Sequence, residues 1–159
     1  MATFSHLDGA GQVQMVDVSD KPETARTAIA LARVRLTPAV AEALAGPGLP
    51  KGDLYAAVRI AAIQGAKRCA ELIPLCHPLP LAKVSVDVEF DREAEELLIA
   101  VFCRTTARTG VEMEALTGAA VGALTAYDMV KGIDKGVVIG EVRLLEKTGG
   151  ASGDWRAES

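Results

Sequence analysis

The sequence is poor in aromatic residues and in histidine. Its 159 residues include one Trp, two Tyr, three Phe and two His, whereas half of them are hydrophobic and 15 are glycine. This hydrophobic fraction is ordinary for a globular protein, and the length suits one domain with a substantial core. Because large rings are so few, we expect a core in which helices and sheet approach one another closely.

Cysteines are few as well. Cys69, Cys76 and Cys103 are odd in number, and none of them belongs to a Cys-x-x-Cys pair. This usage favours neither a disulfide framework nor a zinc site, and it is typical of a protein from a reducing cytoplasm. We predict no metal site, because His77 has no partner at ligand spacing.

The chain also lacks an excess of basic residues, a secretory signal and a long hydrophobic run. Its formal net charge is −4 and its pI is about 5.2, which argues against a nucleic-acid partner. The first residues have neither the basic nor the apolar region of a signal peptide, and no apolar run approaches the ~18 residues of a membrane helix. We therefore expect a soluble cytoplasmic protein that binds neither nucleic acid nor a membrane.

The hydrophobic pattern predicts an α+β fold. Strands are expected over residues 25–36, 83–90, 97–104 and 137–146, and helices over residues 38–44, 53–73 and 110–135. Residues 83–90 alternate apolar and polar side chains most regularly, as a strand with one buried face does. The order of these elements is that of ferredoxin-like folds, in which an antiparallel sheet carries helices packed on one face.

The two ends of the chain do not share this periodicity. Residues 1–24 contain scattered glycine and proline and are predicted to form an extended arm. Residues 147–159 are rich in glycine and are predicted to be a mobile tail. We assign residues 1–159, with both ends included, to a single domain.

Residues 72–81 contain three prolines and the adjacent Cys76 and His77. Each proline pushes the residue before it into extended geometry, so this segment should be a stiff strut in which neighbouring side chains point to opposite sides. A dyad of Cys76 and His77 is therefore not expected. His77 either caps the C-terminal end of the preceding helix or presents a rigidly aimed hydrogen-bonding group.

The last predicted helix has one stripe of residues at spacings of three and four, with polar ends and an apolar middle. The stripe consists of Glu114, Thr117, Val121, Leu124, Asp128, Lys131 and Lys135. Asp128 and Lys131 can meet, either as a surface ion pair or as a proton donor and acceptor.

Glu114 lies 14 residues before Asp128, about 21 Å along a helix axis. If both serve one site, the site is long or is shared by two subunits, and small residues such as Gly118 and Gly122 suggest a helix-mediated oligomer.

Four other charged residues each have two possible roles. Glu112 and Glu114 either complement the positive start of the long helix or accept hydrogen bonds from a guanine-like edge. Lys51, just before a predicted helix, is either solvated or a ligand for an anion. Lys147 opens a glycine-rich segment that is either a flexible tail or a loop whose amides approach a phosphate.

Five longer strings occur in a specific order. They are Met-Val-Asp-Val-Ser-Asp-Lys at 15–21, Lys-Gly-Asp at 51–53, Leu-Ile-Pro-Leu-Cys-His-Pro-Leu at 72–79, Thr-Gly-Val-Glu-Met-Glu-Ala-Leu-Thr at 109–117 and Tyr-Asp-Met-Val-Lys at 127–131. Together they resemble the cyclic pyranopterin monophosphate synthases, the molybdenum cofactor biosynthesis protein C family, from about residue 3 to residue 154. The resemblance implies a ferredoxin-like fold, a hexamer of three dimers and an active site at a subunit interface.

The resemblance further implies a lyase that converts 3′,8-cyclo-7,8-dihydroguanosine 5′-triphosphate into cyclic pyranopterin monophosphate and pyrophosphate. Asp128 and Lys131 would be general acid/base groups, and Lys51 a further catalytic or charge-stabilising lysine. The residues implied to bind the substrate are Leu75, Cys76, His77, Glu112, Met113, Glu114 and Lys147. No external redox cofactor is implied, and whether a divalent metal ion accompanies the triphosphate is left open.

Two positions depart from the family pattern. Ala151 stands in the terminal loop where lysine is usual, which weakens the expected grip on the phosphates. Val130 stands where cysteine is usual, which argues that no thiol is needed there. The alternative to an enzyme is a non-catalytic oligomeric sensor of a nucleotide or pterin, because fold alone does not determine function. A sensor would not obviously need Asp128 and Lys131 beside its ligand.

Overall fold

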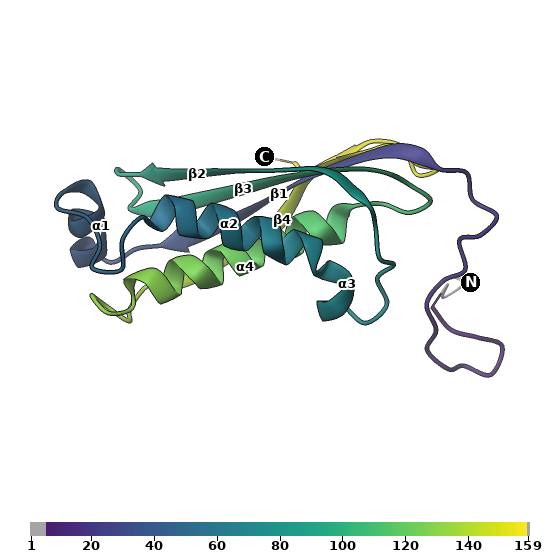
Figure 1. The fold of residues 1–159 in the computed structure, drawn as a ribbon, viewed down its shortest axis with the longest axis horizontal. Helices are drawn as coiled ribbons and strands as arrows, with labels where there is room; N and C mark the ends of the chain where they lie inside the picture. Colours follow the sequence, from purple (N-terminus) through teal and green to yellow (C-terminus); the bar gives the residue numbers. More distant parts are fainter. Residues whose placement is uncertain (1–5, 159) are drawn as a thin grey trace.

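The structure, a computed structural model, describes residues 6–158 and contains one antiparallel sheet with helices on one face (Figure 1). The strands are β1 (Thr24–Arg35), β2 (Leu81–Asp91), β3 (Glu96–Ala107), β4 (Val138–Thr148) and β5 (Trp155–Arg156), and the helices are α1 (Pro38–Ala45), α2 (Leu54–Lys67), α3 (Cys69–Leu72) and α4 (Glu112–Val130). The strand order is β2-β3-β1-β4-β5, and its first four strands have the ferredoxin-like arrangement. The predicted α+β, ferredoxin-like fold is confirmed.

Strand β1 lies inside the sheet, where it pairs with β3 on one side and β4 on the other. Its inward-facing side chains, Ala28, Ala30, Ala32 and Val34, have no exposed surface. Because three of these four residues are alanine, the helices can pack close to the sheet without leaving voids. Packing thus outweighs the helix propensity of alanine in this strand.

Helices α2 and α4 pack against each other through small residues. A Cβ added at Gly118 would lie 2.9 Å from the Ala62 carbonyl oxygen, and one added at Gly65 would lie 2.8 Å from the Val121 Cβ. Both distances are too short for a real contact, so glycine is required at these two crossings. Gly118 and Gly122 therefore serve packing within one chain and do not supply the subunit contact that the sequence suggested. The oligomer itself stays a prediction.

Two helix boundaries differ from the predicted ones. The helix expected over residues 53–73 is interrupted at Arg68, whose N–H contacts the carbonyl oxygens of both Gln64 and Gly65 in a tightened last turn. The helix expected to reach residue 135 ends at Val130, and the chain continues in turns that contain Gly132. The Asp53 side chain caps α2 by accepting a hydrogen bond from the Ala56 N–H at 3.0 Å.

The proline-rich segment is only partly extended. A turn at its start brings the Cys76 N–H to the Ile73 carbonyl oxygen at 3.2 Å, and β2 begins at Leu81. The prediction of a strut over residues 72–81 was therefore wrong for its first residues, since a turn places Pro74 and Leu75 at its corner.

The N-terminal arm leaves the body of the molecule at one end of the sheet (Figure 1). Of the arm predicted over residues 1–24, residues 1–5 lie outside the described range. Residues 6–23 have one isolated bridge, between Leu7 and Val13, and no strand or helix. Because the arm has so few backbone hydrogen bonds of its own, its conformation depends on contacts with the rest of the protein, such as that between the Val16 carbonyl oxygen and His77.

The C-terminal segment contributes to the sheet. Lys147 belongs to β4 and pairs with Ala28, and after the glycine-rich turn β5 returns beside β4, with Trp155 opposite Lys147. Sequence periodicity missed β5, because a strand of two residues carries no detectable alternation. The mobility expected of residues 147–159 stays a prediction.

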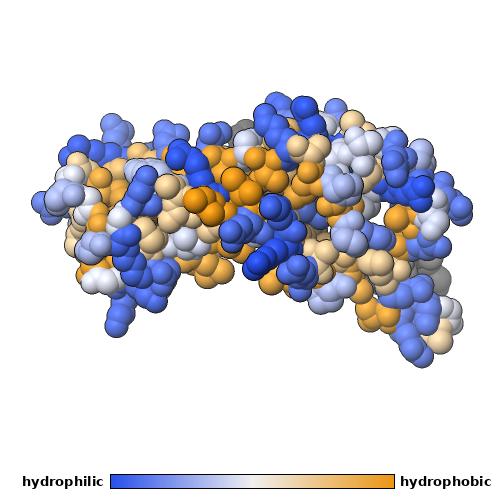
Figure 2. All heavy atoms as spheres, in the orientation of Figure 1, coloured by the Kyte–Doolittle hydropathy of each residue, from blue (hydrophilic) through white to orange (hydrophobic). Residues whose placement is uncertain are grey.

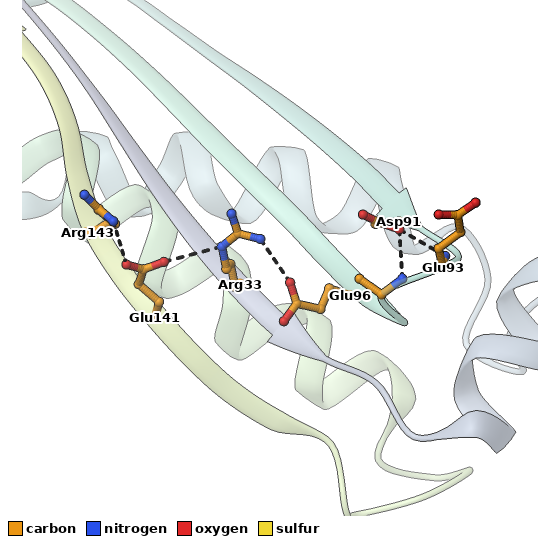
Figure 3. Close-up of polar contacts among 7 residues, drawn as sticks. Arg33, Asp91, Glu93, Glu96, Glu141 and Arg143 are labelled. Carbon is orange, nitrogen blue, oxygen red and sulfur yellow. Dashed lines mark hydrogen bonds and ion pairs between the residues drawn. The ribbon is translucent and has the colours of Figure 1, made fainter. Parts of the chain in front are cut away.

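The helix-free face of the sheet carries an ionic network (Figure 3). Arg33 contacts Glu96 at 3.0 Å and Glu141 at 3.4 Å, and Arg143 also contacts Glu141 at 3.1 Å.

In the orientation of Figure 1, hydrophobic side chains reach the surface in the middle of the face shown in Figure 2. An exposed apolar patch of this kind is suited to contact with another protein surface.

Candidate active site

A cavity of about 450 Å³ lies where the N-terminal arm, the proline-rich segment and the start of α4 meet. Its wall includes all six residues predicted from the two central motifs, namely Leu75, Cys76, His77, Glu112, Met113 and Glu114. The arm contributes His6, Val16, Val18 and Lys21 to the same wall. The sequence-based prediction missed these arm residues, although the string at residues 15–21 was among those that carried the resemblance.

His77 is held by the arm. Its Nε2 lies 2.8 Å from the Val16 carbonyl oxygen. A carbonyl can only accept, so this contact selects the tautomer with hydrogen on Nε2 and leaves Nδ1 as the acceptor of the neutral ring. Of the two roles considered for His77, the aimed hydrogen-bonding group agrees with this geometry, because the partner is the arm and not a helix end.

Glu112 and Glu114 follow each other in the first turn of α4 but have different surroundings. Glu112 pairs with Lys147, whose Nζ is 3.2 Å from Oε1, and Lys147 also donates to the Ser152 hydroxyl at 2.8 Å. Glu114 is only 4% exposed, and burial together with the nearby Glu112 raises its pKa. One carboxylate is thus paired with a cation at the cavity, and the other is almost completely buried in the cavity wall.

The glycine-rich turn after Lys147 folds over Arg26. Gly149, Gly150 and Gly153 have positive φ angles, and a Cβ at Gly150 would overlap the Arg26 guanidinium. The Arg26 Nε is buried and has no hydrogen-bond partner among the described residues. An unpaired guanidinium nitrogen is a possible donor to an anion, whereas the neighbouring Gly149 N–H already donates to Asp154 Oδ1. Sequence spacing could not reveal Arg26, because it lies in β1, far from residue 150 along the chain.

A second polar cluster joins Lys51, Asp128 and Lys131. Asp128 Oδ1 is 2.8 Å from the Lys131 Nζ, and Asp128 Oδ2 is 2.8 Å from the Lys51 Nζ. Lys51 also donates to the main-chain carbonyl of Asp128 at 2.6 Å. The pair predicted at spacing of three is confirmed as a contact, and Lys51 joins it from 77 positions away.

The cluster has a defined protonation state at rest. Hydrogen bonds from Lys131 and then from Lys51 lower the pKa of Asp128 to about 2, and Asp128 in turn raises the pKa of Lys131. Asp128 is therefore ionised and Lys131 is protonated at neutral pH. In this ion-paired state Asp128 is a weak base and Lys131 a weak acid, so proton transfer by either group requires that a bound substrate displaces these contacts.

The cavity and the lysine cluster lie near opposite ends of α4. Glu114 is in its first turn and Asp128 in its last turn, so the 14 intervening steps correspond to about 21 Å along the axis. Within one chain the structure brings Lys147 to the cavity through Glu112, but it does not bring Lys51, Asp128 or Lys131 there.

Two kinds of feature were sought among the described residues, namely clusters of metal-ligating side chains and long apolar helices. Within residues 6–158, no group of three or more His, Cys, Asp or Glu side chains is arranged to hold a metal ion. None of the helices in that range combines the length and the apolar character needed to span a bilayer.

The chain is similar to known proteins over nearly its whole length. Residues 15–150 match the profile described as the MoaC family. A cyclic pyranopterin monophosphate synthase from Streptomyces avermitilis is 58% identical over 152 residues, which cover 96% of this chain and 88% of the relative. Proteins with the same name from Thermomicrobium roseum and Bordetella avium are each 53% identical, and the matches cover 99% and 98% of this chain and 95% and 96% of those relatives. A match of this extent assigns the chain to the MoaC family.

Proposed function

We propose that this protein is a cyclic pyranopterin monophosphate synthase of molybdenum cofactor biosynthesis. It converts 3′,8-cyclo-7,8-dihydroguanosine 5′-triphosphate into cyclic pyranopterin monophosphate with release of pyrophosphate, and it acts in the cytoplasm. Membership in the MoaC family supports this assignment. The observation that carries it is the convergence of Lys51 on the Asp128 and Lys131 pair, because proton-transfer groups at contact distance are required by an enzyme and not by a sensor.

The lysine cluster supplies the proton transfers. Lys131 donates a proton and Asp128 accepts one, in agreement with their protonation at rest. Lys51 adds a second positive charge that stabilises negative charge formed as the ring is rebuilt and the cyclic phosphate closes. Since the pairs are exposed to solvent in the isolated chain, a bound substrate can displace them without a large rearrangement.

The cavity holds the purine-derived part of the substrate. Leu75 and Met113 provide apolar wall, while His77 and Glu114 provide hydrogen-bonding groups to the ring system. Cys76 and Glu112 belong to the same wall. These groups orient the substrate, whereas the lysine cluster carries out the proton transfers.

Lys147 and the glycine-rich turn hold the triphosphate. Lys147 contacts both Glu112 and Ser152. When a phosphate binds, Lys147 exchanges its carboxylate partner for the phosphate. Positive φ angles at Gly149 and Gly150 form a tight turn in which the Gly149 N–H donates to Asp154 Oδ1 at 3.0 Å, and a bound phosphate would replace that carboxylate as the acceptor. This loop retains these features although Ala151 replaces the usual lysine.

A complete site combines the cavity of one subunit with the lysine cluster of another, in a hexamer of three dimers. The separation of about 21 Å along α4 supports this arrangement, because one small reacting centre cannot contact both ends of that helix. The exposed side chains of Ile60 and Leu124, each 60% exposed on neighbouring helices, provide apolar area for subunit contacts.

The test is turnover of the proposed substrate. Purified protein is incubated anaerobically with the cyclised guanosine triphosphate, and pyrophosphate release and the fluorescence of the oxidised pterin product are followed together. We expect both signals to rise in proportion to each other. Binding of the ligand by a folded oligomer with neither signal would refute the enzyme and favour a sensor of nucleotides or pterins.

A further inference from the structure

The part of the N-terminal arm that reaches the cavity is shaped by hydrogen bonds of its own. In this arm strap, residues 16–21, Asp17 Oδ1 accepts hydrogen bonds from the Ser19 hydroxyl at 2.6 Å and from the Ser19 N–H at 2.9 Å. These hydrogen bonds, the one from the hydroxyl first, lower the pKa of Asp17, so its carboxylate stays ionised at neutral pH and can only accept. The Lys21 N–H then donates to the Val18 carbonyl oxygen at 3.0 Å. Two consecutive turns therefore shape a stretch that contains no strand or helix.

The arm strap directs its two valines to the cavity. The side chains of Val16 and Val18 are half-buried and line the cavity wall, whereas Asp17 and Ser19 are exposed and are not part of that wall. This alternation is that of an extended chain, in which neighbouring side chains point to opposite sides. The contact between Asp17 and Ser19 can therefore shape the backbone without occupying the space of the substrate.

A backbone group of the arm strap is bonded to the body of the protein at the cavity. The peptide group between Val16 and Asp17 carries the carbonyl oxygen that lies 2.8 Å from the His77 Nε2. A peptide group is planar, so its direction depends on the backbone dihedral angles on either side of it, one of which is the φ of Asp17. A side-chain acceptor that bonds the N–H two residues later restricts that angle. Asp17 thus controls the direction of the carbonyl that meets His77.

The contact with Val16 decides what His77 offers to a ligand. A neutral imidazole has two tautomers, and the Nε2–H that this carbonyl requires as donor leaves Nδ1 without hydrogen, as an acceptor. Among the described residues no other hydrogen bond involves the His77 ring, so this one contact selects the tautomer. If the carbonyl turned away, the second tautomer would become populated, and its Nδ1–H could not accept a hydrogen bond.

We propose that Asp17 is a positioning residue for His77. Its turn with Ser19 aims the Val16 carbonyl at Nε2, holds the ring in one tautomer and keeps Nδ1 as an acceptor for an N–H group of the guanine-derived substrate. The identity of that substrate rests on the proposed function. The tautomer of the ring does not, so it is measured without turnover.

Three single substitutions separate the turn from the charge and from the arm as a whole. Asp17→Ala removes the acceptor, whereas Asp17→Asn removes the charge but retains an oxygen that forms the same turn. Asp8→Ala is the matched control, because Asp8 is also an exposed arm residue whose Oδ1 accepts two hydrogen bonds, from the N–H groups of Ala10 and Gln12, each at 2.8 Å. The two aspartates differ in that Asp17 adjoins the carbonyl bonded to His77 and Asp8 does not.

The first readout is the tautomer of His77 in the full-length protein labelled with ¹⁵N-histidine. The chain has one other histidine, His6, and the resonances of His77 are assigned by their loss in His77→Gln. Long-range ¹H–¹⁵N correlation spectra are recorded without substrate at alkaline pH, which favours the neutral imidazole. In the wild type we expect an Nε2 that carries hydrogen and an Nδ1 that does not. In Asp17→Ala the share of the other tautomer should rise about three- to tenfold, the factor that corresponds to one hydrogen bond.

The second readout separates KM from kcat for pyrophosphate release. A lost acceptor weakens the ground state and the transition state alike, so Asp17→Ala should raise KM about three- to tenfold and leave kcat nearly unchanged. Asp17→Asn and Asp8→Ala should keep the wild-type tautomer and the wild-type KM. A general loss of folded protein would instead lower the apparent kcat at constant KM, so the two effects are distinct.

The ¹⁵N spectra decide the role of Asp17. Unchanged ¹⁵N shifts of His77 in Asp17→Ala would overturn the proposal. An equal change in Asp17→Asn would overturn it as well, because it would assign the effect to charge, and an equal change in Asp8→Ala would do so by assigning the effect to the arm as a whole. Absence of turnover in the wild type would refute the proposed function and leave the tautomer of His77 as the test of the positioning role.

Discussion

If the active site is shared between subunits, two inactive variants should restore activity when they are combined in one oligomer. His77→Ala damages the cavity and leaves the lysine cluster intact, whereas Lys51→Ala does the reverse. A site built from the cavity of a Lys51→Ala subunit and the cluster of a His77→Ala subunit contains both wild-type halves. The separation of about 21 Å between the ends of α4 is the reason to expect this.

The expected magnitude follows from random assortment. In a mixture of equal amounts, half of the subunits carry an intact cavity and half carry an intact cluster, so about a quarter of the shared sites have both. Activity per subunit should therefore recover to about 25% of wild type. If each chain instead holds its own complete site, every site is damaged, and the mixture cannot exceed the mean of the two single variants.

The assay needs true subunit exchange. The two variants, with different affinity tags, are coexpressed and purified through both tags in sequence, and the mass of the oligomer is measured by light scattering. A mixture of His77→Ala with Glu114→Gln is the matched control, because both changes lie in the cavity and no combination of them restores a site. Failure to recover activity in verified mixed oligomers, or a monomeric mass at working concentration, would refute the shared site.

Three further predictions concern single residues. Asp128→Asn should preserve the circular dichroism spectrum and substrate binding but lower kcat by about 10²-fold or more, since it removes the proton acceptor; near-normal turnover would contradict its role. Lys147→Ala should weaken substrate binding in calorimetry more than it lowers the unfolding midpoint, and unchanged affinity would leave the glycine-rich turn without a role in binding. Gly118→Ala should cost about 1–3 kcal/mol in urea unfolding because its Cβ would meet the Ala62 carbonyl oxygen, whereas Gly132→Ala, which has open space, should be nearly neutral.

The elements that sequence reasoning predicted well are those set by neighbours along the chain. Alternation over residues 83–90 places a strand there because successive side chains must face opposite sides of a sheet. The helix predicted to begin at residue 53 does begin there, because Asp53 caps it through an N–H three residues later. Asp128 and Lys131 meet because residues three apart lie on one side of a helix, so their spacing was enough to predict this contact of the candidate site.

The prediction failed where a distant contact competes with local preference. Gly118 and Gly122 suggested an exposed small-residue surface, but the sequence does not say that α2 crosses them. The proline-rich segment was expected to be extended throughout, yet its first residues turn before β2. The strand β5 has too few residues for any periodicity.

The order of β1 to β4 and of the longer helices, the family and the chemical types available to a site could be predicted from the sequence, because these depend on side-chain identity and on spacings within a few residues. Only long-range packing brings together the pairs of the candidate site, which are Val16 with His77, Lys147 with Glu112, Cys69 with Thr117, and Lys51 with Asp128. These partners are far apart along the chain, and only the packing of the arm and helices around the sheet brings them within hydrogen-bonding distance.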